Sequence, residues 1–227
     1  MTHLEEEKQR LREQMIEMSA LVMSQIGKSL NALVQDDLDL ARDVIKNEKR
    51  VNAYELAIDK SCENIFALLA PFANDMRFVF ATLKINTDFE RIGDNAEGIA
   101  NFVLLEKKSF DKELLDVTNF HEMAETVNEM LSTVSQAYAT KDTKLARSIF
   151  KQDDILDDIN RDATDIIATY IANNPDNIHQ ALHLLTIIRK LERTGDHITN
   201  IAEEIIFYLE AKVLKHGDKV NNKGLKE

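Results

Sequence analysis

The chain has 227 residues, of which 44% are hydrophobic and 30% are charged, so it can bury a core in one large domain or two modest ones. It contains only 6 Gly and 2 Pro. Because these residues mark connections, their scarcity favours long helices over a β-rich or α/β fold. The formal net charge of −12 argues against direct nucleic-acid binding and against docking on acidic lipid, since both need a basic surface.

Three features indicate the compartment. The single cysteine, Cys62, has no partner for an intramolecular disulfide, and residues 1–7 lack a signal-peptide pattern. No charge-free apolar run approaches the roughly 18 residues that span a bilayer. We therefore expect a cytoplasmic protein with no membrane insertion.

The first half of the chain is predicted to form three helices. Apolar residues recur at helical spacing in the first helix, at Leu4, Leu11, Met15, Met18, Val22, Ile26 and Leu33. A short helical stretch at 37–46, which a kink can offset, precedes a middle helix at about 48–70. Pro71 ends the middle helix because its ring clashes with the preceding turn. A third helix follows and carries the motif Glu90-Arg91-Ile92-Gly93-Asp94.

The second half repeats this order. A helix at about 114–139 is followed by a short stretch at 142–150, a middle helix at about 152–173 and Pro175. The last helix carries Glu192-Arg193-Thr194-Gly195-Asp196, 102 positions after the first motif. Apolar residues around both motifs match at this offset and step by four and three, as in closely packed helices: Ile85, Phe89, Ile92, Ala96, Ile99 and Val103, against Ile187, Leu191, Thr194, Ile198, Ile201 and Ile205.

This duplication predicts an all-α fold of two tandem three-helix bundles. The first bundle is expected to span residues 1–108 and the second 109–214. The polar remainder, 215–227, lacks a hydrophobic period and is expected to be a frayed tail. One irregular six-helix bundle is the alternative.

Both motifs place two acids one helical turn apart. With the apolar series facing the core, Glu90 and Asp94 lie on the outer flank of their helix, and so do Glu192 and Asp196. We therefore expect these four acids at the surface rather than as buried structural charges.

The middle helices carry comparable pairs. Glu48 and Asn52 are one turn apart, with Glu55 and Asp59 further along the same flank. Asp153 and Asp157 are the pair in the second half. If the middle and motif helices are neighbours, each half gathers two oxygen pairs on one face. Acids one turn apart repel by about 0.2–0.5 kcal/mol, and a hard cation would offset this repulsion.

A simpler reading of these acids stays open. Arg91 and Arg193 each precede the motif aspartate by three residues and can form ordinary helical salt bridges on a solvated acidic face. Gly93 and Gly195 have two readings of equal weight: close helix packing, or room for a ligand beside the carboxylates.

Other functional motifs are absent or isolated. His179 and His183 are one turn apart, but the spacing of His183 and Glu192 puts them on opposite sides of the helix, so we expect surface or core-edge histidines. No phosphate-binding glycine loop, nucleophile motif or metalloprotease motif occurs, so catalysis is not expected.

The two motif segments resemble a known family. The segment from Arg77 to Ala96 resembles the first signature of the PhoU family of phosphate-signalling regulators. The segment from Leu191 to Glu203 resembles the second signature. The resemblance covers nearly the whole chain, including both repeats.

The resemblance implies a fold, ligands and partners. Family members are tandem three-helix bundles with multinuclear metal clusters on their surfaces, and the metal role carries over to Glu48, Glu90, Asp94, Asp153, Asp157, Glu192 and Asp196. The metals implied are iron, zinc, manganese or magnesium. The family also implies negative regulation of the phosphate-starvation response, through a phosphate ABC transporter ATPase subunit and a sensor histidine kinase, and a homodimer.

The sequence departs from the family pattern at three positions. Asn52 stands where the family usually has Asp, Gly98 where an Asn like Asn200 is expected, and Thr194 where Ile is usual. Asn52 still offers a neutral oxygen, but the first site loses a charge, so we expect tighter metal binding at the second. A metal-buffering protein, a metal-free helical scaffold and a paralogue serving another phosphate transporter remain alternatives.

Overall fold

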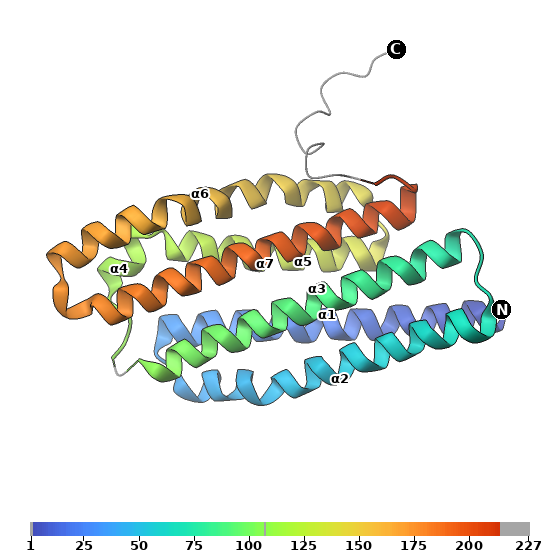
Figure 1. The fold of residues 1–227 in the computed structure, drawn as a ribbon, viewed down its shortest axis with the longest axis horizontal. Coiled ribbons are helices and arrows are strands. Elements are labelled where there is room, and N and C mark those ends of the chain that lie inside the picture. The colour runs from blue at the N-terminus through green and yellow to red at the C-terminus, as the bar shows by residue number, and fades with distance from the viewer. Residues whose placement is uncertain (1, 107, 214–227) are drawn as a thin grey trace, which may run out of the picture.

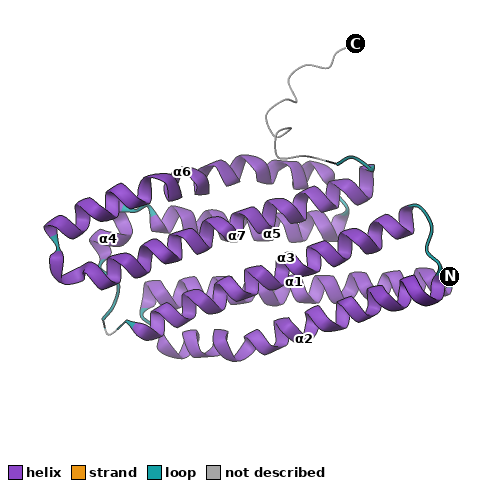
Figure 2. Ribbon diagram, viewed as in Figure 1, coloured by secondary structure: helices purple, strands orange, loops and turns teal. Residues whose placement is uncertain are grey.

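The computed structural model describes residues 2–106 and 108–213. Its elements are seven α-helices and one short 3-10 turn, with no strand in the described residues (Figures 1 and 2): α1 His3–Gln35, α2 Leu38–Leu69, α3 Asn74–Leu105, α4 Lys112–Val117, α5 Phe120–Thr140, α6 Thr143–Asn173, η1 Pro175–Asn177 and α7 Ile178–Glu210. The tail predicted at 215–227 lies outside the described residues. None of the described helices is long and apolar enough to cross a bilayer.

The structure differs from the expected helix boundaries in three places. The stretches 37–46 and 142–150 are not offset by kinks but are the first turns of α2 and α6. Asp37 and Asp142 cap these helices by accepting backbone N–H bonds from the first turn, and neither helix contains a Gly or Pro that would interrupt it. The helix expected at 114–139 is instead α4 and α5, separated at Thr118 and at Asn119, which has a φ of 52°.

The predicted heptad positions face the core. Every member of the two apolar series around the motifs is buried. The apolar positions of α1 are buried as well, except Leu4, which packs at the edge of the core. The sequence period therefore predicted the buried face of the motif helices correctly.

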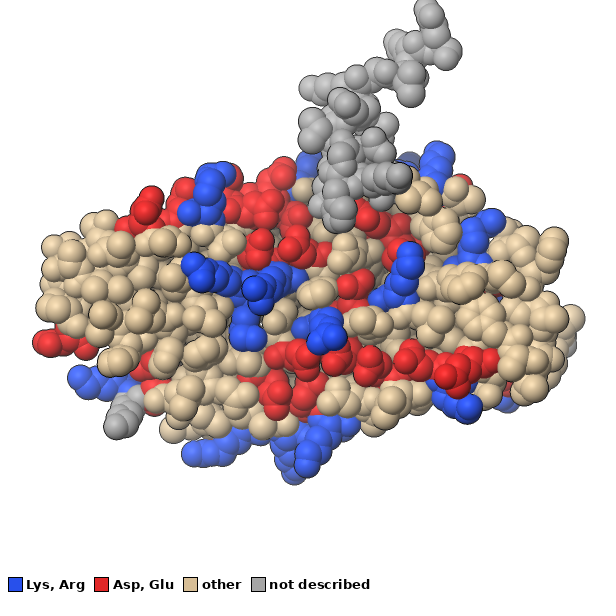
Figure 3. Space-filling view, viewed as in Figure 1, with Lys and Arg blue, Asp and Glu red and all other residues tan. Residues whose placement is uncertain are grey.

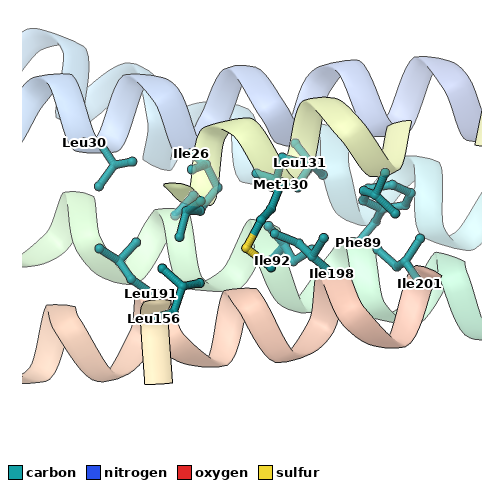
Figure 4. Packing of buried hydrophobic residues seen from close by; sticks show 14 of the residues in the cluster. Ile26, Leu30, Phe89, Ile92, Met130, Leu131, Leu156, Leu191, Ile198 and Ile201 are labelled. Atoms are coloured by element: carbon teal, nitrogen blue, oxygen red, sulfur yellow. The ribbon is translucent and has the colours of Figure 1, made fainter. Parts of the chain in front are cut away.

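The two bundles pack side by side. Helices α1, α2 and α3 form the first, and α5, α6 and α7 form the second. They meet where α3 packs along α7 and α1 along α5, so the buried side chains of both repeats form one continuous cluster. Figure 4 shows Ile92 of α3 and Ile198 of α7 together with Met130 of α5 in this cluster.

This arrangement fixes where the acidic motifs lie. Each middle helix packs on the motif helix of its own repeat, α2 on α3 and α6 on α7. Because α3 and α7 also pack on each other, the two acidic flanks lie on opposite sides of the α3–α7 pair.

Candidate metal centres

The first acidic site lies between α2 and α3. Glu90 and Asp94 lie on the flank of α3 but are half-buried, although they were expected at the surface. Arg91 lies 3.5 Å from an oxygen of each, at the long end for an ion pair, and is itself largely exposed. Such an exposed pair contributes little, so it does not by itself neutralise the site.

Glu48 is the acid whose position the sequence did not predict. It is only 6% exposed, and its place on the same flank as Asn52 did not predict this burial. Gly93 of α3 makes this burial possible, because a Cβ there would lie 3.2 Å from Glu48 Oε2 and 3.0 Å from Val51 Cγ1. Without a side chain at position 93, α3 approaches α2 closely enough to cover the carboxylate.

The electrostatics of Glu48 are unfavourable for an anion. Burial, followed by the charges of Asp94, Glu97, Glu90 and Glu55, raises the pKa of Glu48 to about 7. Its Oε1 accepts no hydrogen bond from any residue that the structure describes. A buried carboxylate in this position needs a proton or a cation.

Two further acids join this site. Glu55 raises the pKa of both Glu48 and Glu90, and its own pKa is raised by burial and by nearby Asp59. Glu97 acts on Glu48 in the same way but was not a predicted site residue. Its position on α3, three residues after Asp94, could have identified it, because residues three apart lie on the same face of a helix.

Asn52 was expected to leave the first site with less negative charge than the second. It is exposed, and Glu55 and Glu97 add two negative charges near the first site. The middle helices match at an offset of 105, which pairs Glu48 with Asp153 and Glu55 with the uncharged Asn160. At the motif-helix offset of 102, Glu97 pairs with the uncharged Thr199. The charge count therefore no longer favours the second site, and its tighter binding stays a prediction.

The second acidic site repeats the arrangement between α6 and α7. Asp153 is 5% exposed, so it is as deeply buried as Glu48. A Cβ at Gly195 would lie 2.9 Å from Asp153 Oδ1 and 2.5 Å from Leu156 Cδ1. Burial, Asp196 and Asp157 raise the pKa of Glu192. In both repeats, then, the motif glycine covers a buried acid of the middle helix, as the close-packing reading proposed.

Polar contacts join the two motif helices between the sites. The Asn95 side chain donates to Thr194 Oγ1 at 3.2 Å, so Thr194, the residue that departs from the usual Ile, has a partner. His197 Nδ1 lies 2.8 Å from Asp88 Oδ1, and the His197 charge also acts on Glu90. Figure 3 shows acids along α2 and α3 and again along α6 and α7, with basic side chains between them.

Lys190 fills the space beside Gly98, the position where the family pattern has Asn. A Cβ at Gly98 would lie 2.6 Å from Lys190 Nζ and 2.7 Å from its Cε. Because these atoms are the end of a flexible side chain, Lys190 can shift to admit a side chain at position 98, so packing does not require glycine there.

The histidine pair and the cysteine stay apart from the acidic sites. His179 is exposed, and His183 is half-buried against the Phe102 ring and contacts Glu106, so both are surface or core-edge residues as expected. Cys62 is buried, and burial raises the pKa of its thiol to about 12, which disfavours the reactive thiolate.

The donors of both sites fit a hard cation. They are carboxylates, one of them a buried acid without a hydrogen bond on one oxygen, which is the oxygen-rich set preferred by magnesium, manganese and iron. Within residues 2–106 and 108–213, no three Asp, Glu, His or Cys side chains are already gathered as a ready-made metal site. Binding would therefore require the acids to turn toward a shared ion. Glu48, Glu90 and Asp94 would hold it in the first site, and Asp153, Asp157, Glu192 and Asp196 in the second.

Known proteins share this sequence and fold over nearly their whole lengths. The PhoU domain matches residues 15–103 and 120–205. The chain is 34% identical to the "phosphate-specific transport system accessory protein PhoU homolog" of Aquifex aeolicus, over 90% of this chain and 92% of that protein. It is 32% identical to the Escherichia coli "phosphate-specific transport system accessory protein PhoU", over 93% and 88%.

Two crystal structures are similar. PhoU from Pseudomonas aeruginosa matches with a TM-score of 0.86 and 30% identity, over 92% of this chain and 100% of that chain. The phosphate transport system regulatory protein PhoU from Streptococcus pneumoniae matches with a TM-score of 0.81 and 27% identity, over 94% and 100%. Together with the duplicated motif on two packed bundles, these matches establish that this chain belongs to the PhoU family.

Proposed function

We propose that this protein is a cytoplasmic negative regulator of phosphate uptake and of the phosphate-starvation response. It acts without catalysis, as a homodimeric adaptor between the ATPase subunit of a phosphate ABC transporter and a sensor histidine kinase. Metal ions held by the acidic sites stabilise the form that makes these contacts.

One observation carries the regulatory role. Both repeats match the PhoU domain, and the relatives matched over nearly their full length are named as accessory or regulatory proteins of phosphate transport. Two packed helical bundles offer long faces for protein contacts, which suits an adaptor.

A deletion strain tests this role. Without the gene, alkaline phosphatase is expected to be made in phosphate-rich medium, and a plasmid copy should restore repression. Phosphatase activity that stays repressed in the deletion strain would contradict the regulatory role, whatever the metal content of the protein.

The metal role is supported by the buried acids under Gly93 and Gly195. A bound cation would neutralise the carboxylates and hold α2 to α3 and α6 to α7. Elemental analysis of purified protein is expected to find metal that is lost in the site variants. We propose Glu48→Gln with Glu90→Gln for the first site and Glu192→Gln with Asp196→Asn for the second.

A matched control separates site loss from a general loss of charge. Glu63→Gln removes an exposed acid on α2 that pairs only with Lys60 in the described contacts, so its metal content should equal that of the wild type. Equal metal content in the wild type and in all variants would show that these acids do not hold the metal.

Metal buffering is the second candidate, because the acids lie in both repeats and Glu48 lacks a hydrogen bond on one oxygen. The deletion strain separates the two functions. A buffer predicts sensitivity to excess metal with normal phosphatase repression, and a regulator predicts the reverse.

A further inference from the structure

The hairpin where α2 meets α3 carries an exposed apolar surface, which we call the tip patch and define as Leu68, Phe72, Met76 and Phe80. Their exposed fractions are 75%, 83%, 39% and 50%. Phe72, Met76 and Phe80 are spaced four residues apart, so they lie along one side of the start of α3 and of the turn that precedes it. The Phe80 ring centroid lies 5.0 Å from that of Phe66, so this stripe borders α2.

The second repeat provides an internal comparison. At the offset of 102 that relates the motif helices, Asn174, Ile178 and Leu182 stand at the positions of Phe72, Met76 and Phe80. The middle helices match at an offset of 105, as for Glu48 and Asp153, which puts Asn173 at the position of Leu68. The Asn174 side chain bonds back to the backbone of Tyr170. Ile178 and Leu182 are 41% and 48% exposed, so the second repeat keeps apolar side chains at the last two positions of the stripe. It forms its hairpin with polar side chains in place of Leu68 and Phe72, so hairpin formation does not account for these two members of the tip patch.

The turn holds Phe72 outward. Pro71 is buried, which fixes the turn to the core, while Phe72 is exposed. Ala70 and Ala73 on either side have positive φ values of 42° and 48°, which alanine rarely adopts. The chain thus presents the ring from a constrained turn rather than folding it back onto the bundle.

We propose that a second copy of this chain covers the tip patch, in a two-fold dimer in which each α2–α3 hairpin packs on the other. This inference rests on the homodimer of the proposed function and assigns its surface. The four side chains expose on the order of 500 Å² in each copy. Two copies therefore bury enough apolar surface to reach the lower bound of about 1,000 Å² for a specific interface.

Charge also favours a second copy at this end of the molecule. Lys8 pairs with Glu5 at 2.7 Å and with Asp75 at 2.6 Å, which ties the start of α1 to the start of α3, and Arg10 pairs with Glu7. Acids and bases are thus mixed beside the tip patch, although the whole chain carries −12. Two copies can meet here with little repulsion, whereas an anionic membrane would repel the chain.

Sedimentation equilibrium of the full chain tests the assignment. The wild type is expected to change from monomer to dimer as its concentration rises through the micromolar range. Phe72→Asn and Leu68→Asn, which copy the second repeat, should each raise the dimer dissociation constant at least tenfold. Leu182→Asn, at the position of Phe80 in the second repeat, should leave it unchanged. Circular dichroism checks that each variant is folded.

Each result decides a different point. A wild type that stays monomeric overturns both this inference and the homodimer of the proposed function, but not the phosphatase result. A dimer that Phe72→Asn leaves intact overturns only the tip-patch assignment. Assemblies larger than a dimer, or a dimer weakened by Leu182→Asn, overturn the two-fold arrangement. Wild-type binding to phosphatidylcholine vesicles that Phe72→Asn abolishes would reassign the patch to lipid.

Discussion

Glu48 is the residue in which folding and ligand binding oppose each other most directly. Its carboxylate is buried among other acids, so the folded protein holds a proton there more tightly than the unfolded chain does, with a pKa of about 7 against 4.5. Because the native state binds more protons, the free energy of unfolding must fall as pH rises from about 4.5 through 7. A bound cation would reverse this trend, since it stabilises the ionised form.

We expect Glu48→Gln to flatten this pH dependence in metal-free protein and to stabilise it by about 1–2 kcal/mol at pH 8, because the amide carries no charge to desolvate. Urea unfolding between pH 5 and pH 8 with a chelator present measures the effect. Glu63→Gln, on the same helix but exposed, serves as the control and should follow the wild type. Parallel curves for the wild type and Glu48→Gln would contradict the burial of this charge.

The motif glycines Gly93 and Gly195 differ in how much room they leave for a side chain. Alanine gains about 1 kcal/mol of helix propensity over glycine, but its Cβ must fit against the middle helix. At Gly93 the nearest atom would be 3.0 Å away, and at Gly195 it would be 2.5 Å away. Gly93→Ala should therefore be close to neutral, whereas Gly195→Ala should destabilise by about 1–2 kcal/mol through overpacking. Equal urea midpoints for both variants would show that the Leu156 and Asp153 side chains shift to admit the methyl group without cost.

At the scale of elements, the heptad period was enough to predict the helices and their buried faces. The motif acids were correctly placed on a flank by the same reasoning. The burial of Glu48 and Asp153 could not be predicted, because it depends on how closely two helices approach across a glycine. The break at Asn119 was missed too, since no Pro or Gly marks it in the sequence.

The caps of α2 and α6 explain why the stretches at 37 and 142 continue into the middle helices. Each aspartate accepts two backbone N–H bonds, at 3.0 and 2.9 Å for Asp37 and at 2.8 and 3.2 Å for Asp142. Asp37→Ala and Asp142→Ala should each lower the free energy of unfolding by about 1 kcal/mol. Replacement by Asn keeps an oxygen acceptor and should cost only a few tenths of that. Thermal unfolding followed by circular dichroism distinguishes the two replacements; an alanine variant as stable as its asparagine counterpart would argue against the caps.

The sequence contains two repeats, but in the folded molecule the two repeats share one hydrophobic core. Helices α3 and α7 contribute to one buried cluster, and the side-chain contacts that cross between them include Asn95 to Thr194, His197 to Asp88 and Lys84 to Glu204. Repeats that share a core in this way should lose their structure together, because exposing one removes packing from the other.

Truncation at that shared surface tests cooperativity. Ile198 on α7 is fully buried beside Ile92 of the first repeat, so Ile198→Ala should cost about 2–5 kcal/mol. The chain has no Trp, so Tyr54→Trp in the first repeat and Phe150→Trp in the second provide separate fluorescent reporters. Both reporters should show the same urea midpoint, and Ile198→Ala should lower both together. A reporter in the first repeat that kept its midpoint would mean that the two bundles fold independently, and that an ion bound between α6 and α7 cannot stabilise the bundle that contains the first acidic site.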